Sequence, residues 1–285
     1  MKIEAAESLF LSWLRHVKEC QLVQTNWKPS PQWERKDEEI LETLMQYSSE
    51  FFKSEYDYDL YKGTKGISQL LKQAEIDVIG VAFNEGKGKI YAIDVAFHEG
   101  GLIYGRSKEE TVSRVIKKCL RTAMCIFGYF SYSDAEIIFA SPKINAAVEK
   151  ELTTVINDMN NTLKEANMNY QIRIIANDDF KEHIFSPLLM ILNDVADTSE
   201  LFMRSLQLYN LFYETSLSSK KTVNSSPTTF ISNNKDDLFP EMKIGVIVRT
   251  VFRNILESGK VPNDEIERMQ DKDYSKKRLI FNIQY

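Results

Sequence analysis

Cysteine and histidine are scarce in this chain of 285 residues, which contains three of each. Cys20, Cys119 and Cys125 cannot all pair within one chain, and no Cys-x-x-Cys spacing occurs. A structural zinc site needs closely spaced Cys and His ligands, and a catalytic triad needs a histidine beside its partners. The composition therefore argues against disulfide-framework, zinc-site and histidine-triad proteins, and it predicts a reducing compartment, the cytoplasm.

The chain also lacks a long apolar run and an excess of positive charge. No segment approaches the roughly 20 apolar residues of a membrane-spanning helix, and the N-terminal segment carries charges throughout and has no signal-peptide cleavage site. The formal net charge is −5, so only a local basic patch could attract nucleic acid. We therefore expect no membrane partner, and no common nucleotide-binding or protease motif is present.

Three regions differ in composition. Residues 1–215 have the apolar periodicities of an α/β domain, residues 216–237 are rich in Ser, Thr and Asn as a linker is, and residues 238–285 read as a small helical or winged-helix-like module. The predicted helices lie at about 3–23, 36–53, 107–124, 145–166 and 178–217, with a break near 197–199. The predicted strands are an edge strand at 56–61, a hairpin at 75–98 and two buried strands at 135–140 and 170–176. Buried strands separated by a helix are typical of parallel crossover units.

The hairpin carries one acid in each of two apolar strands. Tight-turn residues at 84–88 separate the strands, so facing residues should have numbers that sum to about 171 or 172, which places Asp77 opposite Asp94. Opposed like charges destabilise a strand pair, and a divalent cation would offset that cost. The alternatives are that each acid lies at a strand end, or that the strands are slipped by one residue, which would turn Asp94 to the other face.

This order of elements resembles the core of the PD-(D/E)XK, or restriction-endonuclease-like, nuclease superfamily over residues 36–177. Asp77 and Asp94 take the places of the two motif acids, and Glu75 is a candidate third acid on the face of Asp77. The resemblance implies a mixed sheet flanked by helices, and hydrolysis of phosphodiester bonds with Mg²⁺ or Mn²⁺ held by Asp77 and Asp94. The departure is Ala96, which stands where the family has its motif lysine.

Other residues were weighed as substitutes for this lysine. Lys89 has the wrong strand parity, and His98 lies about 13 Å along the strand from Asp94 at roughly 3.3 Å per residue. The helix that follows offers Lys118 or Lys117, and some superfamily members supply the lysine from that helix. The competing interpretation is that these lysines form a solvated basic face and that catalysis has been lost.

Basic residues on the same helix and in the C-terminal module are candidate phosphate contacts. They are Arg114, Lys117, Arg121, Lys276 and Lys277. The first hypothesis is a metal-dependent nuclease acting on DNA, with RNA as a further substrate left open. The second is a catalytically inactive nuclease-fold protein that binds nucleic acid or another protein, and the third is a purely structural partner. A homodimer is compatible with each.

Overall fold

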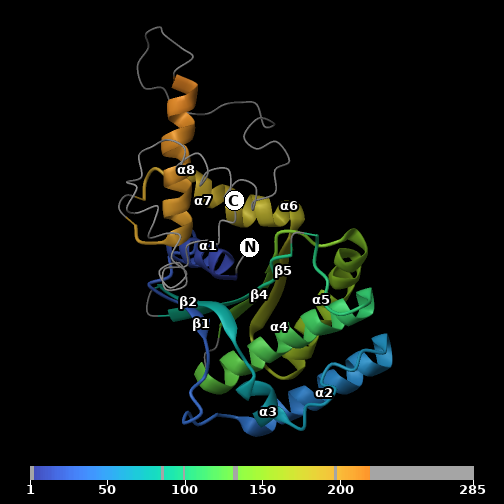
Figure 1. Ribbon diagram of the computed structural model, residues 1–285. Coiled ribbons are helices and arrows are strands. Elements are labelled where there is room, and N and C mark those ends of the chain that lie inside the picture. Colours follow the sequence, from blue (N-terminus) through green and yellow to red (C-terminus); the bar gives the residue numbers. More distant parts are fainter. Residues whose placement is uncertain (1–2, 85–86, 99, 131–133, 196–197, 219–285) are drawn as a thin grey trace, which may run out of the picture. The chain divides into compact units, whose positions relative to one another are not determined.

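The computed structural model describes residues 3–84, 87–98, 100–130, 134–195 and 198–218 (Figure 1). The predicted C-terminal module at 238–285 lies outside the described residues, as does most of the predicted linker at 216–237. Helix α8 (Leu201–Ser218) includes residues 216–218 of the range predicted as linker.

A five-stranded mixed sheet in the order β1-β2-β3-β4-β5 forms the centre of the fold. Strands β1, β2 and β3 pair antiparallel, whereas β3, β4 and β5 pair parallel. This arrangement confirms the α/β class and the two predicted parallel crossovers. The strands are β1 (Leu22–Trp27), β2 (Ile76–Asn84), β3 (Lys87–Val95), β4 (Ala135–Ser141) and β5 (Tyr170–Ala176).

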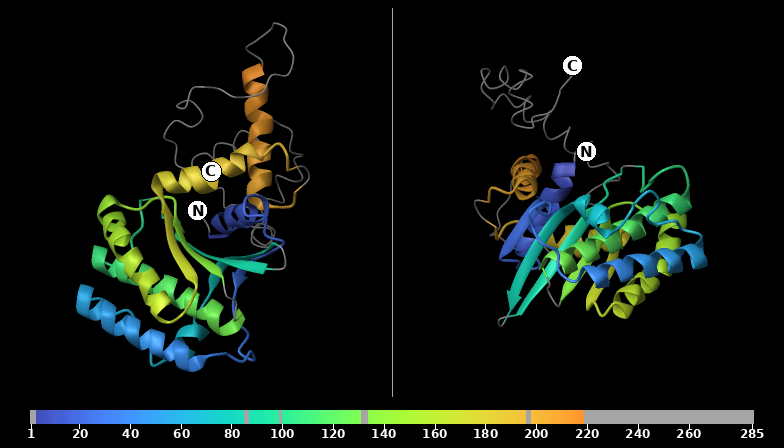
Figure 2. Two further views of the ribbon diagram at one scale, coloured as in Figure 1. Left: turned by 180° about the vertical axis from the view of Figure 1, so that it is seen from behind. Right: turned by 90° about the horizontal axis from the view of Figure 1, so that it is seen from below.

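Helices cover both faces of the sheet (Figures 1 and 2). One apolar core lies between the sheet and α2 to α5, and a second lies between the sheet and α1, α6, η1, α7 and α8. The remaining bounds are α1 (Ile3–His16), α2 (Glu38–Tyr56), α3 (Ile67–Lys72), α4 (Lys108–Phe130), α5 (Ala146–Glu165), α6 (Asn177–Phe180), η1 (Lys181–Phe185) and α7 (Ser186–Met190). Within the described part of the chain, no helix combines the length and apolarity needed to cross a membrane.

All residues of β4 are buried, as its almost wholly apolar sequence predicts for a strand covered on both faces. The two crossover helices, α4 and α5, both pack against the same face of the sheet. The carboxyl end of β3 is therefore followed by a segment that turns beneath the sheet and enters α4. This turn determines which α4 side chains approach the hairpin.

Two predictions about the edge strand are wrong. The helix predicted over 3–23 ends at His16, because Glu19 adopts a left-handed φ of 54° and the chain then pairs with β2 as strand β1. The segment 56–61, predicted as the edge strand, instead follows the end of α2, where the Asp57 N–H caps the helix by donating to Lys53 O. Its alternating aromatic residues are buried in the core beneath the sheet rather than along an edge.

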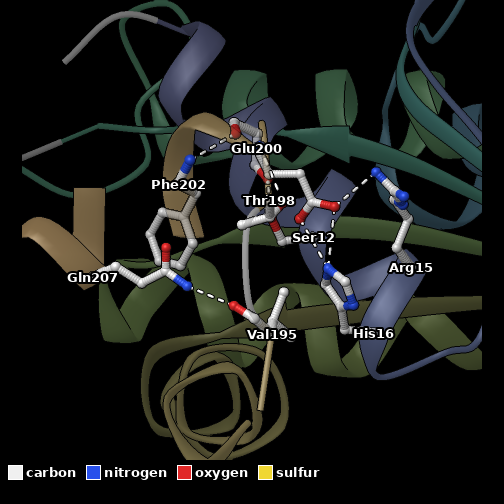
Figure 3. Close-up of polar contacts among 9 residues, drawn as sticks. Ser12, Arg15, His16, Val195, Thr198, Glu200, Phe202 and Gln207 are labelled. Carbon is white, nitrogen blue, oxygen red and sulfur yellow. Dashed lines mark hydrogen bonds and ion pairs between the residues drawn. The ribbon is translucent and has the colours of Figure 1, made fainter. Parts of the chain in front are cut away.

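The segment before α8 is tied to α1 by charged and polar contacts (Figure 3). The buried carboxylate of Glu200 lies 2.8 Å from Arg15 Nη1 and 3.1 Å from His16 Nε2. The backbone N–H of Phe202 donates to Ser8 Oγ at 2.9 Å. These contacts, together with buried apolar side chains from α1 and α8, hold the start of α8 on the face of the sheet opposite α4.

Candidate active site

The hairpin register brings the two predicted acids together. Val78 pairs with Ile93 and Ile79 with Ala92, so facing residues have numbers that sum to 171. Continuing this register by one residue places Asp77 opposite Asp94, which confirms the predicted register. The carboxylate of Asp77 also accepts the Val95 N–H across the strand pair at 2.7 Å. The slipped alternative therefore does not apply.

Asp94 is almost completely buried, with 2% of its surface exposed. Its Oδ2 accepts a hydrogen bond of 2.6 Å from the Thr122 hydroxyl of α4. Its Oδ1 has no hydrogen-bond partner among the described residues. Burial raises the pKa of the Asp94 carboxyl, and the nearby Lys118 charge only partly offsets that rise. A buried carboxylate oxygen without a donor is costly unless a ligand or cation compensates it.

Asp77 is half-buried beside Asp94. Burial and the repulsion from Asp94 raise the pKa of Asp77 to about 6. Two carboxylates at one site titrate as a coupled pair, because the second negative charge must form next to the first in a poorly solvated setting. Near neutral pH the pair therefore favours binding of a positive charge, whether a proton or a metal ion.

The structure brings Lys118 to this pair from α4. Its Nζ lies 3.9 Å from Asp94 Oδ1 and 5.8 Å from the ring centroid of Tyr104, and 31% of its side chain is exposed. Burial opposes the ammonium charge, but the attraction of Asp94, Tyr104 and Asp77 outweighs it, so the pKa of Lys118 lies above its ordinary value. Lys118 thus stays protonated, and its partly exposed side chain lies beside the buried carboxylate.

Lys117, the other predicted substitute, points elsewhere. Its Nζ lies 3.5 Å from Thr64 Oγ1 and 6.0 Å from the ring centroid of Tyr61, in the segment between α2 and α3. The two neighbouring lysines therefore contact different parts of the fold, and of the two only Lys118 reaches the carboxylates.

Glu75 does not join the pair directly. It forms an ion pair of 3.1 Å with Lys28, and 42% of its side chain is exposed. A different acid, Glu7 of α1, is buried and accepts a hydrogen bond of 2.6 Å from Asn26 Nδ2. Its charge contributes to the raised pKa of Asp77, although less than burial and Asp94 do.

Sequence reasoning missed Tyr104, Thr122 and Glu7. Thr122 lies one helical turn after Lys118, and its hydroxyl in an otherwise apolar stripe was a usable signal. Glu7 likewise interrupts the apolar stripe of α1. Tyr104 lies in the irregular segment between β3 and α4, where no periodicity indicates the direction of a side chain.

The residues present are compatible with a divalent cation that is only partly ligated by protein. No group of three or more His, Cys, Asp or Glu side chains suited to a metal occurs within the described ranges. Mg²⁺, however, commonly binds through one or two carboxylates and completes its coordination with water and substrate oxygens. The Asp94 carboxylate, whose Oδ1 accepts no hydrogen bond among the described residues, and the half-buried Asp77 suit this mode.

The predicted phosphate contacts fall into three groups. Arg114 is ion-paired with Glu110 at 2.5 Å. Lys117 and Arg121 have no carboxylate partner within the ion-pair distance in the described part of the chain. Lys276 and Lys277 lie outside the described residues.

Comparisons of the chain with protein-family models, with curated proteins and with solved structures find no match. The chemistry of the site is therefore judged from its own geometry.

Proposed function

We propose that this protein is a divalent-metal-dependent nuclease with a restriction-endonuclease-like core, which hydrolyses phosphodiester bonds of DNA. One observation carries the proposal: the Lys118 ammonium lies 3.9 Å from Asp94 Oδ1, in the strand pair that also holds Asp77. Two acids and a lysine are the set that the resemblance to the PD-(D/E)XK superfamily requires. The lysine that is missing at Ala96 would be supplied in space from α4.

Asp77 and Asp94 would hold Mg²⁺ or Mn²⁺, and Asp94 Oδ1, which accepts no hydrogen bond among the described residues, would be a ligand atom. When bound, such an ion supplies Lewis-acid activation of water and neutralises charge on the phosphate. The Thr122 hydroxyl fixes the orientation of the Asp94 carboxylate, and the Val95 N–H does the same for Asp77. Both acids are thus positioned by donors from secondary structure before any ligand arrives.

Lys118 acts in this proposal as a cation rather than as a base. A lysine whose pKa is raised keeps its proton at neutral pH, so it cannot remove one from water. It can orient the attacking water by donating a hydrogen bond, and it can stabilise negative charge that develops on the phosphate oxygens. Its side chain is partly exposed, with 31% of its surface open to solvent.

The alternative proposal is a catalytically inactive nuclease-fold protein that serves as a nucleic-acid-binding or protein-interaction module. The Lys118–Asp94 ion pair also fits this alternative, because the lysine can have a purely structural role, which is to neutralise a buried carboxylate. The two proposals differ in whether Lys118 is needed for a reaction or only for folding.

Cleavage of plasmid DNA in the presence of Mg²⁺ or Mn²⁺ separates them. We expect Lys118→Met and Asp94→Asn each to lower the cleavage rate by about 10² to 10⁴, the range typical of a positioned catalytic group. Lys118→Arg, which keeps the charge, should retain more activity than Lys118→Met. The matched control is Lys164→Met, an exposed lysine at the end of α5, near the opposite end of the sheet.

Each variant is first checked for folding by circular dichroism. If the folded wild-type protein does not cleave DNA with either metal ion but does bind it, the inactive alternative is supported. If Lys118→Met cleaves as fast as Lys164→Met, the assigned role of Lys118 is wrong.

A further inference from the structure

A second polar surface adjoins the carboxylate site and has an excess of positive charge. It consists of Lys117 and Arg121 on α4 and of the loop 62–66, Lys-Gly-Thr-Lys-Gly, which we call the KGTKG loop. Lys117 contacts this loop through Thr64 Oγ1 at 3.5 Å. Arg121 donates from Nη1 to Gln73 O at 3.3 Å, next to the end of α3, and α3 itself packs against α4.

Neither of the two α4 cations has a carboxylate within ion-pair distance in the described part of the chain. Burial and the repulsion from Arg121 lower the pKa of Lys117, and the charge of Asp59 offsets this only in part. The Arg121 Nε is buried and lacks a partner there, and a guanidinium has five N–H donors to satisfy. Other basic side chains of this fold do have acidic partners, as Arg114 has Glu110.

The KGTKG loop leaves open space beside its two glycines. A Cβ added at Gly63 or Gly66 would meet no atom within 4 Å, so both glycines face open space. Gly63 has a φ of +77°, which an L side chain rarely adopts, so the loop conformation depends on glycine. Lys62 and Lys65 beside these glycines are exposed. Exposed lysine side chains next to such open space are suited to contact phosphate groups.

We propose that the KGTKG loop, Lys117 and Arg121 bind phosphate groups in the backbone of DNA, and that they position the phosphodiester at the carboxylate site. This inference rests on the proposed function, because it names where the substrate of that site is held. Helix α4 connects the two surfaces, since its Lys118 contacts Asp94 whereas its Lys117 and Arg121 contact the KGTKG loop and the end of α3. The neutralisation of this surface by phosphates compensates for the like charges gathered there.

The test is the salt dependence of DNA binding, measured by fluorescence anisotropy with a short labelled duplex in EDTA, so that no cleavage occurs. One double variant is Lys117→Gln with Arg121→Gln, and a second is Lys62→Gln with Lys65→Gln in the exposed loop, where folding is least affected. The matched control, Lys164→Gln with Lys181→Gln, removes the same charge from two other exposed lysines. Lys117→Arg with Arg121→Lys keeps both charges.

Each phosphate contact contributes about 0.9 to the slope of log affinity against log salt concentration. We expect either test variant to reduce this slope by about 1 to 2 and to weaken binding at least several-fold. The control variant and the charge-conserving variant should keep the wild-type slope.

Test variants that bind with the slope and affinity of the control would overturn the inference, as would a wild-type protein that binds a mononucleotide but not the duplex. Cleavage of DNA in the separate metal-dependent assay decides the proposed function. Reduced slopes without cleavage would support the phosphate-binding surface but refute the nuclease and the positioning role that rests on it. Cleavage with unchanged slopes would support the nuclease and refute the phosphate-binding surface.

Discussion

Replacing Asp77 with asparagine should make the protein more stable at neutral pH. In the wild-type protein, burial and Asp94 raise the pKa of Asp77 to about 6, compared with an ordinary value of 3.8. The folded state then binds the proton more tightly than the unfolded chain does, so the free energy of unfolding falls as the pH rises from about 4 to about 6. The ionised Asp77 therefore destabilises the folded wild-type protein fully above pH 6, and it has no such effect below pH 4, where Asp77 is protonated in both states.

A pKa difference of about 2 corresponds to about 3 kcal/mol at 1.4 kcal/mol per tenfold change in equilibrium constant. Some of this gain is lost because asparagine is a weaker acceptor than carboxylate for the Val95 N–H. We therefore expect Asp77→Asn to raise the free energy of unfolding by about 1 to 3 kcal/mol at pH 7 to 8. For a folded region of this size, each kcal/mol corresponds to about 2 to 4 °C in Tm.

The assay is urea or thermal denaturation of the wild-type protein and Asp77→Asn between pH 4 and pH 8, in EDTA. The matched control is Glu42→Gln, which removes an exposed carboxylate from α2 and should change the stability by less than about 0.5 kcal/mol. Adding millimolar Mg²⁺ or Mn²⁺ should then stabilise the wild-type protein but not Asp77→Asn, because only the intact pair binds the ion in the folded state.

A destabilised Asp77→Asn whose deficit does not depend on pH would refute this reasoning. It would mean that the Asp77 charge is already compensated within the fold and that the two carboxylates form a structural network. A wild-type protein that melts at the same temperature with and without metal would count against cation binding at this pair, even if the pH dependence were as expected.

Three further predictions concern the surroundings of the site. Thr122→Val should lower the free energy of unfolding by about 1 to 3 kcal/mol in urea denaturation, because the buried Asp94 loses its 2.6 Å hydrogen bond. Thr122→Ser should stay close to wild type. Equal stabilities of Thr122→Val and the wild-type protein would contradict a stabilising role of this bond. Gly101→Ala should lower the free energy of unfolding by about 1 to 3 kcal/mol in the same assay, since Gly101 has a φ of +100° and a Cβ there would lie 2.5 Å from Asn145 Oδ1. An unchanged stability would show that the loop relaxes freely around the added methyl group. All three cysteines are buried, so a thiol reagent such as Ellman's should react slowly with the native protein and fully after denaturation, and rapid native labelling would contradict the burial.

Local signals in the sequence were sufficient to predict the hairpin and its two acids. Glycine-rich turn residues between two apolar strands predict that facing residues have numbers that sum to about 171 or 172, and the sum of 171 found in the structure places Asp77 opposite Asp94. The almost wholly apolar run of β4, the apolar residues of β5 and the helix between them likewise indicate parallel crossovers, because strand burial and helical periodicity are properties of short segments.

The edge strand β1 could not be predicted from such local signals. The apolar stripe of α1 continues in the sequence past His16, and nothing local opposes a longer helix except the polar residues around Glu19. What makes β1 a strand is its pairing with β2, which lies about 50 residues away in the sequence. An edge strand formed by such a distant partner depends on tertiary contacts.

Only the tertiary structure decided which lysine meets the acids. Consecutive residues on a helix point about 100° apart, so Lys117 and Lys118 cannot both contact the carboxylates, and the sequence does not state how α4 is rotated against the sheet. The packing of its apolar stripe determines that rotation and directs Lys118 to Asp94 and Lys117 to the KGTKG loop. Tyr104 joins the site for a similar reason, since an irregular segment takes its direction from what it packs against rather than from its own residues.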